Sequence, residues 1–95
     1  MNKLLKDILY KTGIEELVGN TNIAIDKICF DSREVEDASL FVAVVGTAVD
    51  GHQFINQTIE KGATAIVCEQ FPEQLHDGIT YVKVKNSAAA LGIIA

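Results

Sequence analysis

The sequence lacks three features that would each point to a class of protein: a run of basic residues, a long apolar segment and a cluster of cysteines. Its 95 residues include eight Lys and Arg against thirteen Asp and Glu, and no basic stripe could follow a nucleic-acid backbone. No segment approaches the roughly 20 apolar residues of a membrane span, and the N-terminus has no uninterrupted apolar stretch of a secretion signal. We therefore expect a cytoplasmic protein that binds neither nucleic acid nor membrane.

The two cysteines do not form a recognisable metal or disulfide pattern. Cys29 and Cys68 lie in separate apolar stretches, without a C-x-x-C pair or a histidine cluster nearby. Buried free thiols are the favoured interpretation. The acidic residues also lack metal-ligand spacing, so the sequence predicts no metal site.

The apolar pattern predicts an α/β domain in three layers, with a mostly parallel, mixed sheet of four to five strands and flanking helices. Helices are expected over residues 3–11, which Gly13 would end, over 54–61, which Gly62 would end, and after Asn86. Strands are expected at 40–45, at 64–68 and, as an edge or half-exposed strand, at 79–84, while 14–18 reads as a short turn. Residues 23–30 fit either one strand with a bulge or two short strands.

Residues 40–68 have the length and order of a strand, a helix and a second, parallel strand. Ligands of parallel sheets bind at the carboxyl ends of the strands, and here that place is the loop between Gly46 and Gly51. The two glycines have P-loop spacing, G-x-x-x-x-G, but His52 and Gln53 stand where Lys and Ser or Thr would be. The loop therefore favours a phosphorylated ligand without phosphoryl transfer. The alternative is an ordinary loop in which Asp50 caps the next helix.

A second polar group, Asp31-Ser32-Arg33, follows the strand that ends near Phe30. The Ser32 hydroxyl and the Arg33 guanidinium suit contacts with a carbonyl or phosphate. The structural alternative is a turn in which Arg33 pairs with Asp31 or Asp50.

No residues in this sequence assemble a nucleophile, a base and an orienting group, so we expect no catalytic residue in it. At a helix start, His52 is expected to be a solvated side chain or a donor to a phosphate rather than a catalyst. The apolar helix after Asn86 has no stop signal before Ala95. This pattern predicts that residues 1–95 are the N-terminal domain of a longer protein.

Several motifs in a fixed order resemble the N-terminal domain of the Mur ligase family, most closely its E-type members, the UDP-N-acetylmuramoyl-tripeptide synthetases. The resemblance covers residues 28–69, and its motifs are Asp31-Ser32-Arg33, Leu-Phe-Val-Ala-Val-Val-Gly at 40–46, Asp50-Gly51-His52, Phe54-Ile55, and Gly62-Ala63 with Ala65. One departure is the segment Asp37-Ala38-Ser39, because the family usually has a glycine before the Leu-Phe pair.

The resemblance implies an ATP-dependent ligase that adds a diamino acid, meso-diaminopimelate or L-lysine, to UDP-N-acetylmuramoyl-L-alanyl-D-glutamate in peptidoglycan biosynthesis. The present domain would hold the UDP part of that substrate. ATP and Mg²⁺ would bind in a central domain beyond Ala95, and the amino acid in a C-terminal domain. The implied UDP contacts are Phe30, Ser32, Thr47, Ala48 and Val49, with Asp31, Arg33, Gly46, Asp50, Gly51 and His52 as possible supporting residues.

Two other interpretations remain open. F-type ligases, which add D-alanyl-D-alanine, share the Asp-Ser-Arg and Asp-Gly-His motifs. A stand-alone nucleotide-binding or interaction domain would need no ligase partner.

Overall fold

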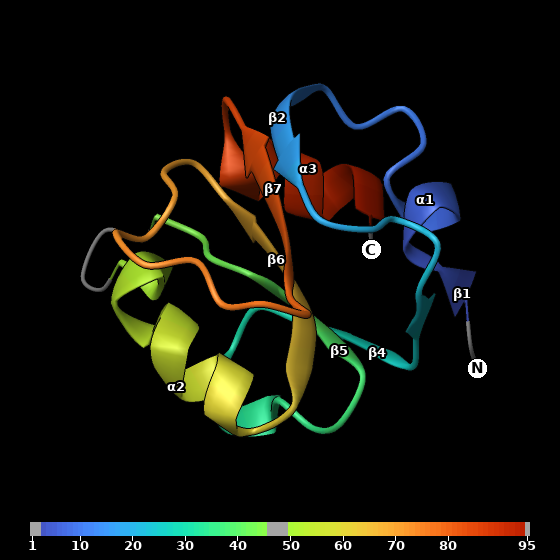
Figure 1. Cartoon of the computed structure of the whole chain (residues 1–95). Helices are drawn as coiled ribbons and strands as arrows, with labels where there is room; N and C mark the ends of the chain where they lie inside the picture. Colours follow the sequence, from blue (N-terminus) through green and yellow to red (C-terminus); the bar gives the residue numbers. More distant parts are fainter. Residues whose placement is uncertain (1–2, 46–49, 95) are drawn as a thin grey trace.

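A computed structural model describes residues 3–45 and 50–94 of the chain, and a five-stranded sheet runs through its centre (Figure 1). The order across the sheet is β2-β7-β6-β5-β4, and all neighbours are parallel except β2, which runs antiparallel to β7. The strands are β2 (Ile14–Val18), β4 (Lys27–Cys29), β5 (Ser39–Val42), β6 (Ala63–Cys68) and β7 (Thr80–Val84). A separate two-stranded sheet joins β1 (Lys3–Leu4) to β3 (Ala24–Ile25).

Helices cover both faces of the large sheet, so the predicted three-layer α/β architecture is confirmed. Helix α2 (Ile55–Glu60) lies on one face, and α1 (Leu5–Ile8) and α3 (Ser87–Ile94) lie on the other (Figure 1). There are two short 3₁₀ helices. The first, η1 (Ser32–Glu34), follows β4, and the second, η2 (Gly51–Phe54), directly precedes α2. None of the helices in the described ranges is long and apolar enough to cross a membrane.

Strand β5 contributes to both cores because neighbouring side chains of a strand point to opposite faces. Leu40 and Val42 pack in the cluster that contains Leu5 and Ala90 from α1 and α3. Phe41 packs in the cluster on the α2 side. The continuous apolar run at 40–45 thus predicted a strand buried on both faces, as observed, although the strand ends at Val42.

The crossover from β5 to β6 also agrees with its prediction. The two strands are parallel, and α2 connects them. Gly62, with φ of +118°, follows the end of α2. Its backbone lies against the turn at Asp37, and the Ala38 N–H donates to the Gly62 carbonyl at 3.0 Å. Ala38 itself has φ of +59°, which explains why glycine suits this position.

Strands β2 and β7 differ from their predictions. The segment at 14–18 is strand β2 rather than a turn, and β7 is a buried inner strand rather than an edge. Every side chain of β2 is exposed, and a strand without a buried face needs no alternation of apolar and polar residues. The segment is a strand because its backbone pairs with β7.

The first helix is also shorter than predicted. Lys3 and Leu4 pair with β3 in place of extending α1, which covers only Leu5–Ile8. The positive φ after this helix belongs to Lys11, at +72°, and not to Gly13.

Three smaller predictions are confirmed. Residues 23–30 form two short strands in different sheets, which was one of the two alternatives. Asn86 caps α3, since its Oδ1 accepts the Ala89 N–H at 3.0 Å. Cys29 and Cys68 are buried free thiols, and burial raises the pKa of Cys68 to about 11.

The tight packing at Gly62 can be tested by adding one methyl group. In Gly62→Ala a Cβ would lie 2.7 Å from Asp37 Cα, in a backbone conformation that alanine disfavours. We expect the free energy of unfolding, measured by urea titration, to fall by about 2–4 kcal/mol. The matched control is Gly92→Ala in α3, where nothing lies within 4 Å and stability should rise by up to about 1 kcal/mol. Equal stabilities of the two variants would contradict the packing.

Candidate functional site

A cavity of about 550 Å³ opens at the carboxyl ends of β4 and β5. Its lining residues come from the turn after β4, from the segment after β5, and from η2 and α2. They are Phe30, Asp31, Ser32, Arg33, Val44, Gly51, Phe54 and Gln57. The topology therefore brings the Asp-Ser-Arg turn and the second glycine of the loop to one place, as expected for a parallel sheet.

Five of the predicted site residues line this cavity: Phe30, Asp31, Ser32, Arg33 and Gly51. Asp50 and His52 flank the lining residue Gly51 in the sequence but do not line the cavity themselves. The remaining four, Gly46, Thr47, Ala48 and Val49, lie outside the described residues. Their predicted contacts stay predictions.

The turn after β4 is fixed by a fork between Asp31 and Arg33. Arg33 Nη2 donates to Asp31 Oδ2 at 2.8 Å, and Arg33 Nε donates to Asp31 Oδ1 at 3.1 Å. The backbone N–H of Arg33 donates to the same Oδ1 at 2.9 Å, so Asp31 also caps η1. These bonds to Arg33 lower the pKa of Asp31 to about 2. The structural alternative for Arg33, a pair with Asp31, is what the structure contains.

Lys61, which sequence analysis missed, secures the same turn from the end of α2. Its Nζ donates to the carbonyl oxygen of Ser32 at 3.1 Å. The bond spans 29 positions in the chain, so no local pattern announces it. Lys61 therefore brings a second positive charge close to the cavity rim beside Arg33.

Gly51 is needed because two backbone segments meet there. Its N–H donates to the Val44 carbonyl at 2.9 Å, and a Cβ at this position would lie 2.9 Å from Val44 N. Next to it, Val45 and Asp50 form an isolated antiparallel bridge. A side chain at Gly51 would push η2 away from the end of β5 and so deform the cavity wall.

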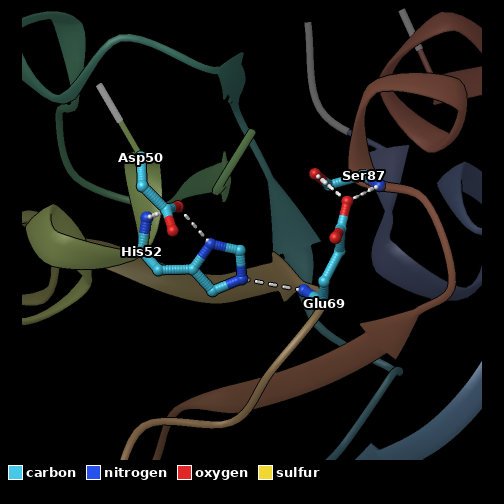
Figure 2. Close-up of polar contacts among 4 residues, drawn as sticks. All are labelled: Asp50, His52, Glu69 and Ser87. Carbon is cyan, nitrogen blue, oxygen red and sulfur yellow. Dashed lines mark hydrogen bonds and ion pairs between the residues drawn. The ribbon is translucent and has the colours of Figure 1, made fainter. Parts of the chain in front are cut away.

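Asp50 and His52 form a hydrogen-bonded unit behind this wall (Figure 2). Asp50 Oδ1 accepts the His52 backbone N–H at 3.0 Å and lies 2.7 Å from His52 Nδ1. Both bonds lower the pKa of Asp50, and the bond from the His52 backbone N–H contributes more than the bond from the His52 ring. The predicted capping role of Asp50 is confirmed.

The His52 ring is held by protein on both sides. Its Nε2 accepts the backbone N–H of Glu69 at 2.9 Å, so Nδ1 must carry the proton and donate to Asp50. Only 17% of the side chain is exposed. The expectation of a solvated or phosphate-bound His52 was wrong, because both ring nitrogens already have protein partners.

Val44, Phe54 and Gln57 line the cavity without having been predicted to do so. Phe54 and Gln57 are three positions apart at the start of α2, the spacing that puts two side chains on one helical face. That spacing was a usable signal. Val44 carried none, since it looked like any other residue of an apolar strand.

In the ranges 3–45 and 50–94, no group of three His, Cys, Asp or Glu residues could hold a metal ion. The P-loop position for lysine is occupied by His52, whose nitrogens are both engaged. The cavity can hold an anionic or aromatic ligand.

Comparison with known proteins decides the family. The model described as "Mur ligase family, catalytic domain" matches residues 24–95. The chain belongs to the Mur ligase family. The resemblance of the Asp-Ser-Arg and Asp-Gly-His motifs is thereby confirmed.

Among Mur ligases, the named relatives are identical to this chain at nearly half of the aligned positions. The UDP-N-acetylmuramoyl-L-alanyl-D-glutamate--2,6-diaminopimelate ligase of Cytophaga hutchinsonii is 49% identical over 92 residues, 96% of this chain and 19% of that protein. The ligase of the same name from Bacteroides fragilis is 46% identical over 88 residues, 93% of this chain and 18% of that protein. The chain thus spans about a fifth of the length of these relatives.

Solved structures of Mur ligases share the fold. A crystal structure of MurF from Acinetobacter baumannii superposes with a TM-score of 0.84 at 22% identity, over 98% of this chain and 20% of that one. MurF ligase from Thermotoga maritima in complex with ADP has a TM-score of 0.62 at 32% identity, over 72% of this chain and 15% of that one.

The Asp31–Arg33 fork predicts how the turn responds to pH. Because folding lowers the pKa of Asp31 to about 2, the fork should stabilise the turn above about pH 4 and be lost as the pH falls through about 2. A ¹³C NMR titration of the Asp31 carboxyl should give a midpoint near 2. In Arg33→Ala the midpoint should return toward about 3.9, whereas Arg33→Lys should restore only part of the shift. An unchanged midpoint in Arg33→Ala would refute the fork in solution.

Proposed function

We propose that this chain is the UDP-binding domain of a ligase that adds a diamino acid, meso-diaminopimelate or L-lysine, to UDP-N-acetylmuramoyl-L-alanyl-D-glutamate in peptidoglycan biosynthesis. The observation that carries the proposal is the cavity at the ends of β4 and β5, which combines the aromatic rings of Phe30 and Phe54 with the paired Arg33 guanidinium and with Lys61 bonded to the Ser32 carbonyl. The names of the relatives from C. hutchinsonii and B. fragilis support the substrate and diaminopimelate as the first candidate for the added amino acid.

In this proposal the uracil ring lies against Phe30, and Ser32 contacts the uridine or the diphosphate. Phe30 is 62% exposed at the cavity, so its ring is available for stacking. Thr47, Ala48 and Val49 would meet the nucleotide through their backbone. Gly46, Gly51, Asp31 and Arg33 would support the ligand from the two turns.

The rest of the reaction would take place in other domains of a longer protein. ATP and Mg²⁺ would bind there. The solved T. maritima ligase, of which this chain covers 15%, is in complex with ADP. We expect the whole protein to work in the cytoplasm.

The second candidate is an F-type ligase, which adds D-alanyl-D-alanine. The MurF ligase from T. maritima favours it, with 32% identity over 72% of this chain, and the A. baumannii MurF structure has the same fold. At 22% identity, however, the A. baumannii structure speaks only for the fold, whereas the sequence relatives at 49% and 46% carry the diaminopimelate name. We therefore favour the E-type function.

The two candidates differ in the amine that they accept. The full-length protein that carries this chain should form product from UDP-N-acetylmuramoyl-L-alanyl-D-glutamate, ATP and either meso-diaminopimelate or L-lysine, detected by mass spectrometry. D-Alanyl-D-alanine offered with the corresponding UDP-tripeptide should give none. Product with D-alanyl-D-alanine alone would establish the F-type function, and no product with any amine would reject both.

The UDP site can be tested apart from catalysis. In the same protein, Phe30→Ala should weaken UDP binding by about tenfold in calorimetric titration, because one base-stacking contact is worth roughly 1–3 kcal/mol. The matched control is Tyr10→Ala, which removes an aromatic ring that is 74% exposed away from the cavity lining. Equal affinities of the two variants would remove Phe30 from the site.

A further inference from the structure

A chain of hydrogen bonds leads from the wall of the cavity to the N-terminus of α3 (Figure 2). It begins at Asp50, passes through the His52 ring to the backbone of Glu69, and continues through the Glu69 carboxylate to Ser87. These residues are separated by up to 37 positions in the sequence, so the contacts depend on the fold. They lie at the carboxyl ends of the inner strands and follow β5, β6 and β7 in turn.

The first half of this chain fixes η2 to the end of β6. η2 supplies Gly51 and Phe54 to the cavity, while His52, from the same turn, directs its ring toward Glu69 (Figure 2). His52 thus holds the cavity wall from behind without belonging to the lining. The bond from the Glu69 N–H to Nε2 is a direct polar link between η2 and the end of β6.

The second half fixes α3 to the same point. Glu69 Oε2 accepts two hydrogen bonds from Ser87, one from its backbone N–H at 2.8 Å and one from its hydroxyl at 2.9 Å. Ser87 is fully buried and Glu69 is half-buried, so these bonds are partly shielded from water. A carboxylate at a helix N-terminus also interacts favourably with the helix dipole. Glu69 therefore serves both sides, through its backbone to His52 and through its side chain to Ser87.

We propose that His52 is a positioning residue that couples the nucleotide cavity to the N-terminus of α3. This inference rests on the proposed UDP-binding function. A ligand that presses on Gly51 and Phe54 orders η2, and the His52–Glu69 bond carries that order to Ser87. By linkage, the factor by which the ligand favours the ordered N-terminus of α3 equals the factor by which that order strengthens ligand binding. Loosening the N-terminus of α3 must therefore weaken binding.

Two substitutions at His52 separate its two bonds. His52→Gln places an amide oxygen near the position of Nε2, where it can accept the Glu69 N–H, whereas the shorter His52→Asn keeps only the partner on the Asp50 side. In the full-length protein we expect UDP to bind about three- to tenfold more weakly to His52→Asn, and within about twofold of the wild type to His52→Gln. A role in stability alone would not distinguish the two variants in this order.

Hydrogen exchange measures the coupling directly. UDP should slow amide exchange, followed by mass spectrometry, in peptides that contain Ser87 as well as in those that contain Gly51. In His52→Asn the protection at Ser87 should disappear while the protection at Gly51 remains.

A second variant tests the link from the far end and leaves His52 intact. Ser87→Ala removes one of the two bonds to Glu69 and should weaken UDP binding by about two- to threefold. The matched control is Thr80→Val, which removes another largely buried hydroxyl bond, 2.6 Å to the Asn20 carbonyl, at the opposite end of the sheet. UDP affinity should not change in Thr80→Val.

The outcomes separate this inference from the function on which it rests. Failure of UDP to bind the wild-type protein would overturn both. UDP binding that is equal in the wild type, His52→Asn and Ser87→Ala, or protection at Ser87 that persists in His52→Asn, would overturn the coupling and leave the UDP site standing. If His52→Asn does not fold, the comparison of Ser87→Ala with Thr80→Val decides.

Discussion

The parallel pairing of β5 with β6 is the constraint on which the other parts of this domain depend. Leu40 and Phe41 are neighbours in β5, yet they belong to different cores because a strand directs successive side chains to opposite faces. Both helical layers are therefore built around the same strand. The direction of that strand also decides where the cavity lies, since the turns that line it can only follow the carboxyl ends of parallel strands.

The cavity is shaped by short hydrogen bonds rather than by an excess of positive charge. The chain carries a formal net charge of -5, and the guanidinium of Arg33 is already paired with Asp31. The Lys61 ammonium group is held near the cavity by its hydrogen bond to the Ser32 carbonyl oxygen. A phosphate that approaches this rim would thus meet side chains held in place beforehand, which reduces the conformational entropy lost on binding.

Sequence reasoning succeeded where a single segment determined the outcome. The apolar run at 40–45, the end of α2 before Gly62 and the Asp50 cap could each be read from adjacent residues, although Gly62 also packs against the distant Asp37. It failed where a distant partner decided: β2 exists because β7 pairs with it, and the Nε2 of His52 is occupied because Glu69 donates its backbone N–H to it. For the site, the Asp-Ser-Arg turn and Gly51 were found, whereas Lys61 depends on a contact across 29 positions.

The exposed strand β2 leaves one side of the sheet with unsatisfied hydrogen-bonding capacity, a risk for self-association. Ile14, Leu17 and Val18 are all partly exposed along it, so another strand would find apolar partners there. Two features oppose such an addition. Glu15 and Glu16 place carboxylates in the middle of the strand, and the register shift between Ile14 and Glu16 breaks its regular repeat. The glutamates that hid this strand from its sequence pattern thus help to keep the domain from aggregating.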